Sequence, residues 1–146
     1  MVRFKLLISL VAAVLLLAAC GTKDRSVSGR IVGTWQGENS VEQKFTDSGG
    51  FSFTQNFEAP ATLVYSADST LTLSITISDA NSYLLEGNAN TDGNRLFFCG
   101  KLTMGEVLDV TGEMTLNEAG ELFLSYQGYS EVGIEHKAEA ILTRIK

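Results

Sequence analysis

The sequence predicts an all-β domain in which eight antiparallel strands follow one another and close into a small up-and-down barrel. Seven clusters of turn-forming residues punctuate the chain after Ile31, and after a longer first interval they recur about every dozen residues. This spacing leaves no room for a crossover helix, so successive strands should pair as antiparallel neighbours. The clusters lie at residues 47–50, 67–70, 79–82, 92–93, 104–106, 117–120 and 130–133.

Alternation of apolar and polar residues assigns two faces to the predicted strands. From Leu71 to Ile77 every odd-numbered residue is apolar and every even-numbered one carries a hydroxyl group. The segment Val107–Leu116 repeats the alternation, with its apolar set on even numbers. An apolar inside and a polar outside argue against a membrane-spanning barrel. Pro60 marks a bulge or a sheet edge in a long second strand.

Glycines recur on the predicted inner face. Gly87, Gly100, Gly112 and Gly128 share the parity of the apolar residues in four successive strands. Glycine lets strands coil sharply and close a small barrel, and the many apolar residues of the same interior favour this geometric interpretation. The alternative is that the missing side chains leave a cavity. An eight-stranded barrel has the size at which the interior is either filled or able to hold one small ligand.

The N-terminal segment has the three parts of a secretory signal. Residues 1–5 carry two basic side chains, residues 6–17 are almost wholly apolar, and two alanines precede Cys20. The run Leu17–Cys20 resembles a bacterial lipobox. The resemblance implies that a signal peptide of residues 1–19 is removed and that Cys20 carries a diacylglyceryl group and an acyl chain. An uncleaved membrane helix and an ordinary signal with an incidental cysteine are the alternatives.

Residues 20–30 are predicted to be the lipidated cysteine and a flexible polar tether, followed by a barrel domain over residues 31–146. The chain has 11 basic and 17 acidic residues, and removal of the signal takes two basic ones, which leaves a net charge of about −8. This balance argues against nucleic-acid binding and against broad adhesion to anionic lipids. The N-terminal lipid is therefore the expected contact with the membrane.

The lipobox resemblance places the protein in the bacterial cell envelope. In enteric-type sorting, an aspartate directly after the lipidated cysteine favours the inner membrane. Gly21 occupies that position, which favours the outer membrane. The periplasmic and the external face both stay open.

Cys99 has no disulfide partner if Cys20 carries lipid. It ends the apolar run Leu96–Cys99, where we expect a small buried hydrophobe. A reactive thiol needs a base or a positive charge beside it, and the lone His136 is distant in sequence.

No constellation of residues indicates an enzyme or a cofactor. His136 stands between two charged residues, and we expect it to be a solvated surface side chain. Without a second histidine or a cysteine cluster, the usual kind of zinc site is not expected. Glu106, Asp109 and Glu113 alternate on an outer face, where a carboxylate pair for acid–base chemistry or calcium competes with an ordinary solvated face.

Gly33-Thr34-Trp35, at the start of the first predicted strand, resembles the glycine-x-tryptophan signature of the calycins, the superfamily of lipocalins, fatty-acid-binding proteins and avidins. The resemblance implies a barrel whose closed end is packed by Trp35 beneath a basic residue of the last strand. Arg144 is the first candidate for that residue, and Lys146 the second. Trp35 is the only tryptophan, so the tryptophan-lined pocket of avidins has no counterpart, and the resemblance identifies no ligand.

Phe51, Phe53 and Phe57 share one parity in the second predicted strand. If the first two strands extend past the barrel rim, these rings line an open mouth and receive an apolar guest; otherwise they belong to the core. The candidate ligand site joins these three rings to three inner positions, Gly100, Gly112 and Tyr126.

Two functions follow from these observations. The first is a lipid-tethered protein whose lipocalin-like barrel binds a small apolar or amphipathic ligand. The alternative is a non-enzymatic lipoprotein with a filled barrel that binds an envelope protein, as an assembly factor, an inhibitor or a structural component.

Overall fold

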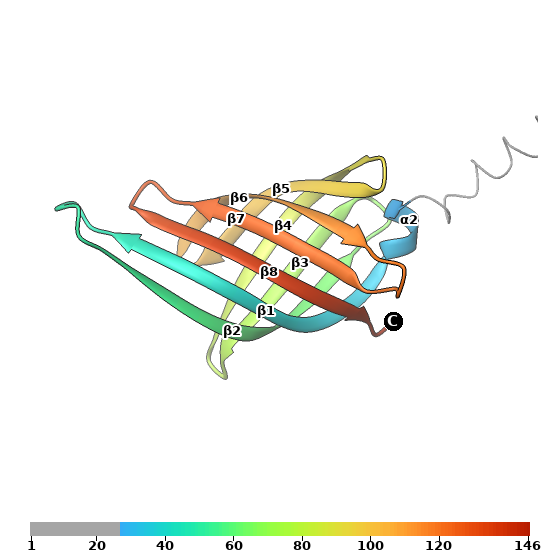
Figure 1. Ribbon diagram of the computed structural model, residues 1–146, viewed down its shortest axis with the longest axis horizontal. Coiled ribbons are helices and arrows are strands. Elements are labelled where there is room, and N and C mark those ends of the chain that lie inside the picture. The colour runs from blue at the N-terminus through green and yellow to red at the C-terminus, as the bar shows by residue number, and fades with distance from the viewer. Residues whose placement is uncertain (1–26) are drawn as a thin grey trace, which may run out of the picture.

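Eight antiparallel strands close into a barrel in the computed structural model, which describes residues 27–146 (Figure 1). Each strand pairs with the next, and β8 pairs with β1, which confirms the predicted up-and-down topology. The elements are α2 (Val27–Ile31), β1 (Gly33–Thr46), β2 (Ser52–Tyr65), β3 (Thr70–Ser78), β4 (Asn81–Asp92), β5 (Arg95–Met104), β6 (Glu106–Leu116), β7 (Leu122–Tyr129) and β8 (Ile134–Arg144). The predicted signal peptide, Cys20 and the first part of the predicted tether lie outside the described residues.

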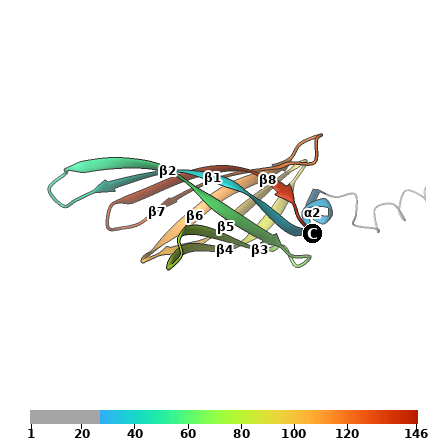
Figure 2. The same cartoon turned by 90° about the horizontal axis from the view of Figure 1, so that it is seen from below.

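The short helix α2 has no counterpart in the sequence prediction, which assigns its first four residues to the tether. It lies beside the C-terminus at one end of the barrel, which we call the closed end (Figures 1 and 2). The side chain of Ile31 is fully buried there, and Trp35 Nε1 donates a hydrogen bond of 2.9 Å to the Ile31 carbonyl. Within residues 27–146, no helix has the length and apolar character needed to cross a membrane.

The opposite end, which we call the open end, is uneven because the β1–β2 hairpin projects beyond the other strands (Figure 1). Strand β2 pairs with β1 along its whole length but with β3 only over Ala61–Tyr65. Among the described residues, Ser52–Pro60 therefore forms a free sheet edge. Pro60 directly precedes the first residue of β2 that pairs with β3, which confirms its predicted position at an edge.

The inner face carries the core, as the alternation predicts. Leu71, Leu73 and Ile75 of β3 are buried, and so are Leu108, Val110 and Met114 of β6, while the intervening hydroxyl and carboxyl side chains face outward. Since burial on one face of each strand removes a large apolar area from water, the hydrophobic effect fixes which face turns inward.

The inner glycines lie where neighbouring groups approach too closely for a side chain. Gly87 and Gly100 are register partners, and a Cβ atom on Gly87 would lie 2.5 Å from the Cys99 carbonyl oxygen. A Cβ atom on Gly112 would lie 2.5 Å from Cζ of Phe98. These contacts support the geometric interpretation of the glycines, because the space above them holds backbone or an aromatic ring.

Cys99 corrects the sequence prediction. Its side chain is an exposed free thiol on the outside of β5, and the buried residues of that segment are Leu96 and Phe98. The run of four apolar residues contains no polar residue to mark the outer face, so its parity is ambiguous until the neighbouring strands fix it.

Candidate functional site

The calycin-like signature residues meet at the closed end. The Arg144 guanidinium lies 4.5 Å from the centroid of the Trp35 ring, and its Nη1 donates a 2.7 Å hydrogen bond to the Val32 carbonyl. Gly33 has a φ of 145°, and a Cβ atom there would lie 2.5 Å from the Lys146 carbonyl oxygen. Gly33 thus leaves room for the backbone that follows β8, and Arg144, not Lys146, lies over the indole, as the calycin resemblance implies for its first candidate.

In the half nearest the open end, the interior becomes polar. Asn39, Gln43 and His136 are each 0% exposed, and they are the fully buried polar side chains of residues 27–146. All three occupy inner positions of β1 or β8, and Gln43 is the register partner of His136. We call these residues, together with Gln55 and Tyr126, the polar cluster.

A chain of side-chain hydrogen bonds orders the part of the polar cluster nearest the mouth. Gln55 Nε2 donates to Gln43 Oε1 at 2.8 Å, and Gln43 Nε2 lies 3.1 Å from His136 Nδ1. An amide nitrogen only donates, so His136 Nδ1 accepts, and the neutral ring carries its proton on Nε2. Desolvation by burial lowers the pKa of His136 to about 4, so the imidazole is neutral at neutral pH.

Tyr126 links the histidine to Asn39. Its ring stacks on His136 with centroids 5.6 Å apart, and its hydroxyl accepts a 3.0 Å hydrogen bond from Asn39 Nδ2. Tyr83 of β4 approaches the same imidazole edge-on at 6.4 Å. Burial raises the pKa of Tyr126, so the phenol is also neutral. The polar cluster therefore offers hydrogen bonds and aromatic faces without a net charge.

Two buried polar atoms of the cluster have no hydrogen-bond partner among the described residues: Asn39 Oδ1 and His136 Nε2. A buried unpaired group costs about 1 to 3 kcal/mol. The register partners of Asn39 are Ala59 and Ala140, so small side chains flank it on both neighbouring strands. One unpaired acceptor and one unpaired donor therefore lie in the interior, and small side chains flank the acceptor.

The mouth in front of the polar cluster is aromatic. Phe45 and Phe53 stack with centroids 5.0 Å apart, and a hollow of about 310 Å³ lies between them and the β7–β8 turn, beside Phe51 and Val132. Phe51 is 72% exposed and Phe53 is 55% exposed. The β1–β2 hairpin extends past the rim, as the mouth hypothesis requires, so these two rings are not core residues.

The other predicted ligand-site residues have different surroundings. Phe57 is half-buried and packs against the core, while Tyr126 belongs to the polar cluster. Gly100 faces the backbone of β4, and Gly112 faces the ring of Phe98. The structure brings Phe51 and Phe53 together at the mouth and Tyr126 behind it, but it leaves no open space directly above the two glycines.

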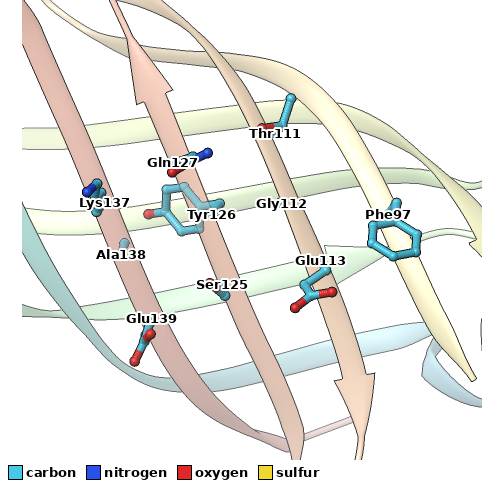
Figure 3. A pocket seen from close by; sticks show the side chains of 10 residues that line it. All are labelled: Phe97, Thr111, Gly112, Glu113, Ser125, Tyr126, Gln127, Lys137, Ala138 and Glu139. Carbon is cyan, nitrogen blue, oxygen red and sulfur yellow. The ribbon is translucent and has the colours of Figure 1, made fainter.

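A second hollow, of about 440 Å³, lies on the outer wall across β5 to β8 (Figure 3). Outward side chains including Phe97, Glu113, Lys137 and Glu139 surround it, and Gly112 and Tyr126 form part of its floor. None of those four side chains is fully buried, and the hollow is open to solvent. It therefore lacks the unpaired buried groups that distinguish the interior.

Two of the three outer carboxylates, Asp109 and Glu113, each face a base, and the third, Glu106, lines the hollow at the mouth. Asp109 contacts Lys101, and Glu113 lies 3.7 Å from Arg95. Each acid thus faces a base on β5 and is exposed, as on an ordinary solvated surface. Within residues 27–146, no three histidine, cysteine or acidic side chains gather in a way that could hold a metal ion.

His136 corrects the sequence prediction most clearly. The residues on either side of it, Glu135 and Lys137, suggest a solvated surface, but in a strand those neighbours point away from it. A signal was present in the sequence, because His136 shares its parity with the buried residues Ala138, Ala140 and Leu142. Asn39 and Gln43 share the parity of Trp35 in the same way.

No protein-family model matches the chain, and no curated protein matches it. The likeness to calycins therefore consists of two features: the eight-stranded antiparallel up-and-down barrel, and the contacts of Gly33, Trp35 and Arg144. Both are compatible with a calycin-like fold.

Proposed function

We propose that this protein is a lipid-tethered, lipocalin-like binding protein of the bacterial cell envelope that holds a small amphipathic molecule in the open half of its barrel. The observation that carries the proposal is the pairing of an exposed aromatic mouth with a buried polar cluster that has two unsatisfied atoms. An amphipathic guest suits both parts, because its polar group can pair with the cluster while its apolar part contacts the phenylalanines.

The apolar half of the interior offers no comparable site. Its side chains are buried and pack against one another in a single cluster that includes Trp35 and Leu124. Helix α2 covers that end. A guest therefore enters from the open end, where Phe51 and Phe53 already expose apolar area to water. The role proposed is binding, without catalysis.

The proposed anchor is the lipid on Cys20, in the outer membrane in preference to the inner one because Gly21 follows it. The seven residues from Cys20 to Val27 span at most about 25 Å when fully extended. Strand β1, with 14 residues, is about 46 Å long and covers about 35 Å of the barrel axis at the usual strand tilt. Since α2 lies at the closed end, a tether of this length cannot bring the mouth to face the anchoring membrane.

Native mass spectrometry of protein extracted gently from its own membrane tests the binding function. We expect a small molecule to leave with the wild-type protein and to be lost from a double variant, Phe51→Ser with Phe53→Ser. The matched control is Phe97→Ser, an exposed phenylalanine on the outer wall, which should keep the guest. A wild-type barrel that carries no small molecule, and that takes up none of a panel of alkyl amphiphiles, would contradict the proposal.

The anchor is tested separately by fractionation. Wild-type protein should stay with the membrane and yield an N-terminal peptide that begins with a lipidated Cys20. The Cys20→Ala variant should carry no lipid at its N-terminus. Any membrane association that it keeps would then be independent of a lipid. An unmodified Cys20 in membrane-bound protein would contradict the lipoprotein assignment.

The second candidate function, an envelope interaction protein, is favoured by one observation: the free edge of β2 at Ser52–Pro60. A free edge offers backbone donors and acceptors to an extended segment of a partner. Photo-crosslinking from Asn56 should then return one dominant envelope protein. The control is Thr115, which lies on β6 between two paired strands, and an equal yield from both positions would contradict edge binding.

A further inference from the structure

We infer that the guest of this barrel enters head first and that its head is an uncharged group carrying both a hydrogen-bond donor and an acceptor, while its apolar tail stays at the aromatic mouth. This inference rests on the proposed binding function and specifies its ligand class. A hydroxyl group, a primary amide and an undissociated carboxylic acid have this chemistry.

The head-group chemistry follows from the two unpaired atoms. Asn39 Oδ1 is an acceptor and requires a donor from the guest. His136 Nδ1 accepts from Gln43, so His136 Nε2 bears the proton and requires an acceptor. A head that carries both a donor and an acceptor has the two kinds of group that these atoms lack, whereas a pure donor or a pure acceptor leaves one of them without a partner.

Charge is excluded from the head by the composition of the interior. The buried side chains of residues 27–146 include no lysine, arginine, aspartate or glutamate. A carboxylate placed there would have no countercharge and would face the oxygen of Asn39. An ammonium group would likewise lack an anion and would face the N–H group of His136. Burying either ion without a partner is costly, so neutral heads are favoured.

The orientation follows from the order of layers along β1. From the mouth inward, the register pairs are Phe45 with Phe53, Gln43 with Gln55, Val41 with Phe57, and Asn39 with Ala59. The rings of Phe45 and Phe53 thus come first, and both unpaired polar atoms lie deeper: His136 is level with Gln43, and Asn39 lies beyond the Val41–Phe57 pair. A guest that entered tail first would place its alkyl chain against Asn39 and His136 and leave both atoms unsatisfied.

Gln55 and Gln43 form the first polar layer that a head meets behind Phe45 and Phe53. Gln43 is buried, whereas Gln55 is exposed and lies on the part of β2 that pairs with β1 alone. Rotation of the Gln55 side chain toward solvent breaks one hydrogen bond between neutral groups and uncovers Gln43. This rotation leaves the strand pairing of the barrel intact.

Four alkyl probes of one chain length test the head group on full-length protein at neutral pH: a primary alcohol, a primary amide, a carboxylate and an ammonium. We expect the alcohol and the amide to bind at least about tenfold more tightly than either ion, because an ion leaves the interior with an uncompensated charge. Equal affinities, or tightest binding of the carboxylate, would overturn the inference while leaving the binding function standing. Binding of none of the probes would instead count against the binding function itself.

Variants test whether the preference for neutral heads depends on Asn39 Oδ1 and His136 Nε2. His136→Leu should lose most of the preference for the alcohol, whereas His136→Gln, which restores an amide donor, should recover it. Phe53→Ser should weaken all four probes to a similar extent, because it touches only the tail. If His136→Leu and Asn39→Leu both fold and keep the full selectivity, buried water satisfies the two atoms and the inference is wrong.

Orientation has its own readout, because Trp35 is the only tryptophan and lies at the closed end. A guest alcohol brominated at the far end of its tail should quench Trp35 fluorescence weakly if the head is innermost. Bromine next to the hydroxyl-bearing carbon should quench more strongly. The reverse order would overturn head-first entry.

Discussion

Acidification should destabilise this protein through His136, and a His136→Gln variant isolates that contribution. The imidazole has a pKa of 6.5 when solvated and about 4 when buried in the folded barrel. Above pH 6.5 both states are neutral and the residue adds no pH dependence. Between pH 6.5 and about 4, the unfolded chain binds a proton that the folded chain refuses, so folding stability falls as the pH is lowered.

The size of the effect follows from the shift. Each pKa unit corresponds to about 1.4 kcal/mol, so the full loss is about 3 kcal/mol and is reached near pH 4. This is a substantial fraction of the stability of an ordinary small domain, which is about 5 to 15 kcal/mol. Burial of the ring is the physical cause, and the hydrogen bond from Gln43 to Nδ1 also favours the neutral form.

Urea titrations followed by Trp35 fluorescence give the unfolding free energy at each pH. The acidic side chains titrate in both proteins, so the informative quantity is the difference between the wild type and His136→Gln. That difference should change by about 3 kcal/mol from pH 7.5 to pH 4, while Lys137→Gln, an outward neighbour, should follow the wild type. Parallel curves for wild type and His136→Gln would show that the imidazole is solvated, and would refute its burial.

Three further outcomes are expected. Gly112→Ala forces a Cβ atom to within 2.5 Å of an inner phenylalanine ring and should cost about 1 to 3 kcal/mol in urea unfolding, whereas Gly49→Ala, in a turn, should be nearly neutral. Arg144→Ala should lower stability by about 1 to 2 kcal/mol and alter Trp35 fluorescence, and an unchanged spectrum would contradict the stacking. In a Cys20→Ala background, Cys99 should react with an aqueous thiol reagent at full stoichiometry without denaturant; protection until unfolding would mean that it is buried.

The strand pattern made much of the fold predictable. Period-two alternation in Leu71–Ile77 and Val107–Leu116 fixed the inner face, and the turn clusters fixed the number and order of the strands. The contact of Arg144 with Trp35 was predictable because Gly33-Thr34-Trp35 is a short motif with a family resemblance. The lipobox at Cys20 remains a prediction from sequence.

The candidate site was only partly predictable. Phe51, Phe53 and Tyr126 were recognisable from their parity, whereas His136 was taken for a surface residue because of its charged neighbours. In a strand, adjacent residues share no environment, so local charge is a poor guide to burial. Cys99 was misassigned for the opposite reason, since an unbroken apolar run marks neither face.

By itself, the sequence determined that this chain forms eight alternating strands with an apolar inside, because the hydrophobic pattern of each strand is a local property. Only the tertiary structure decided what the inside contains near the open end. Pairing of β1 with β2 and β8 brought Asn39, Gln43 and His136 together, and the short β2–β3 pairing left the β1–β2 hairpin extended with its phenylalanines exposed. Register is set by all strands jointly as the barrel closes, so no single strand encodes a polar cluster behind an aromatic mouth.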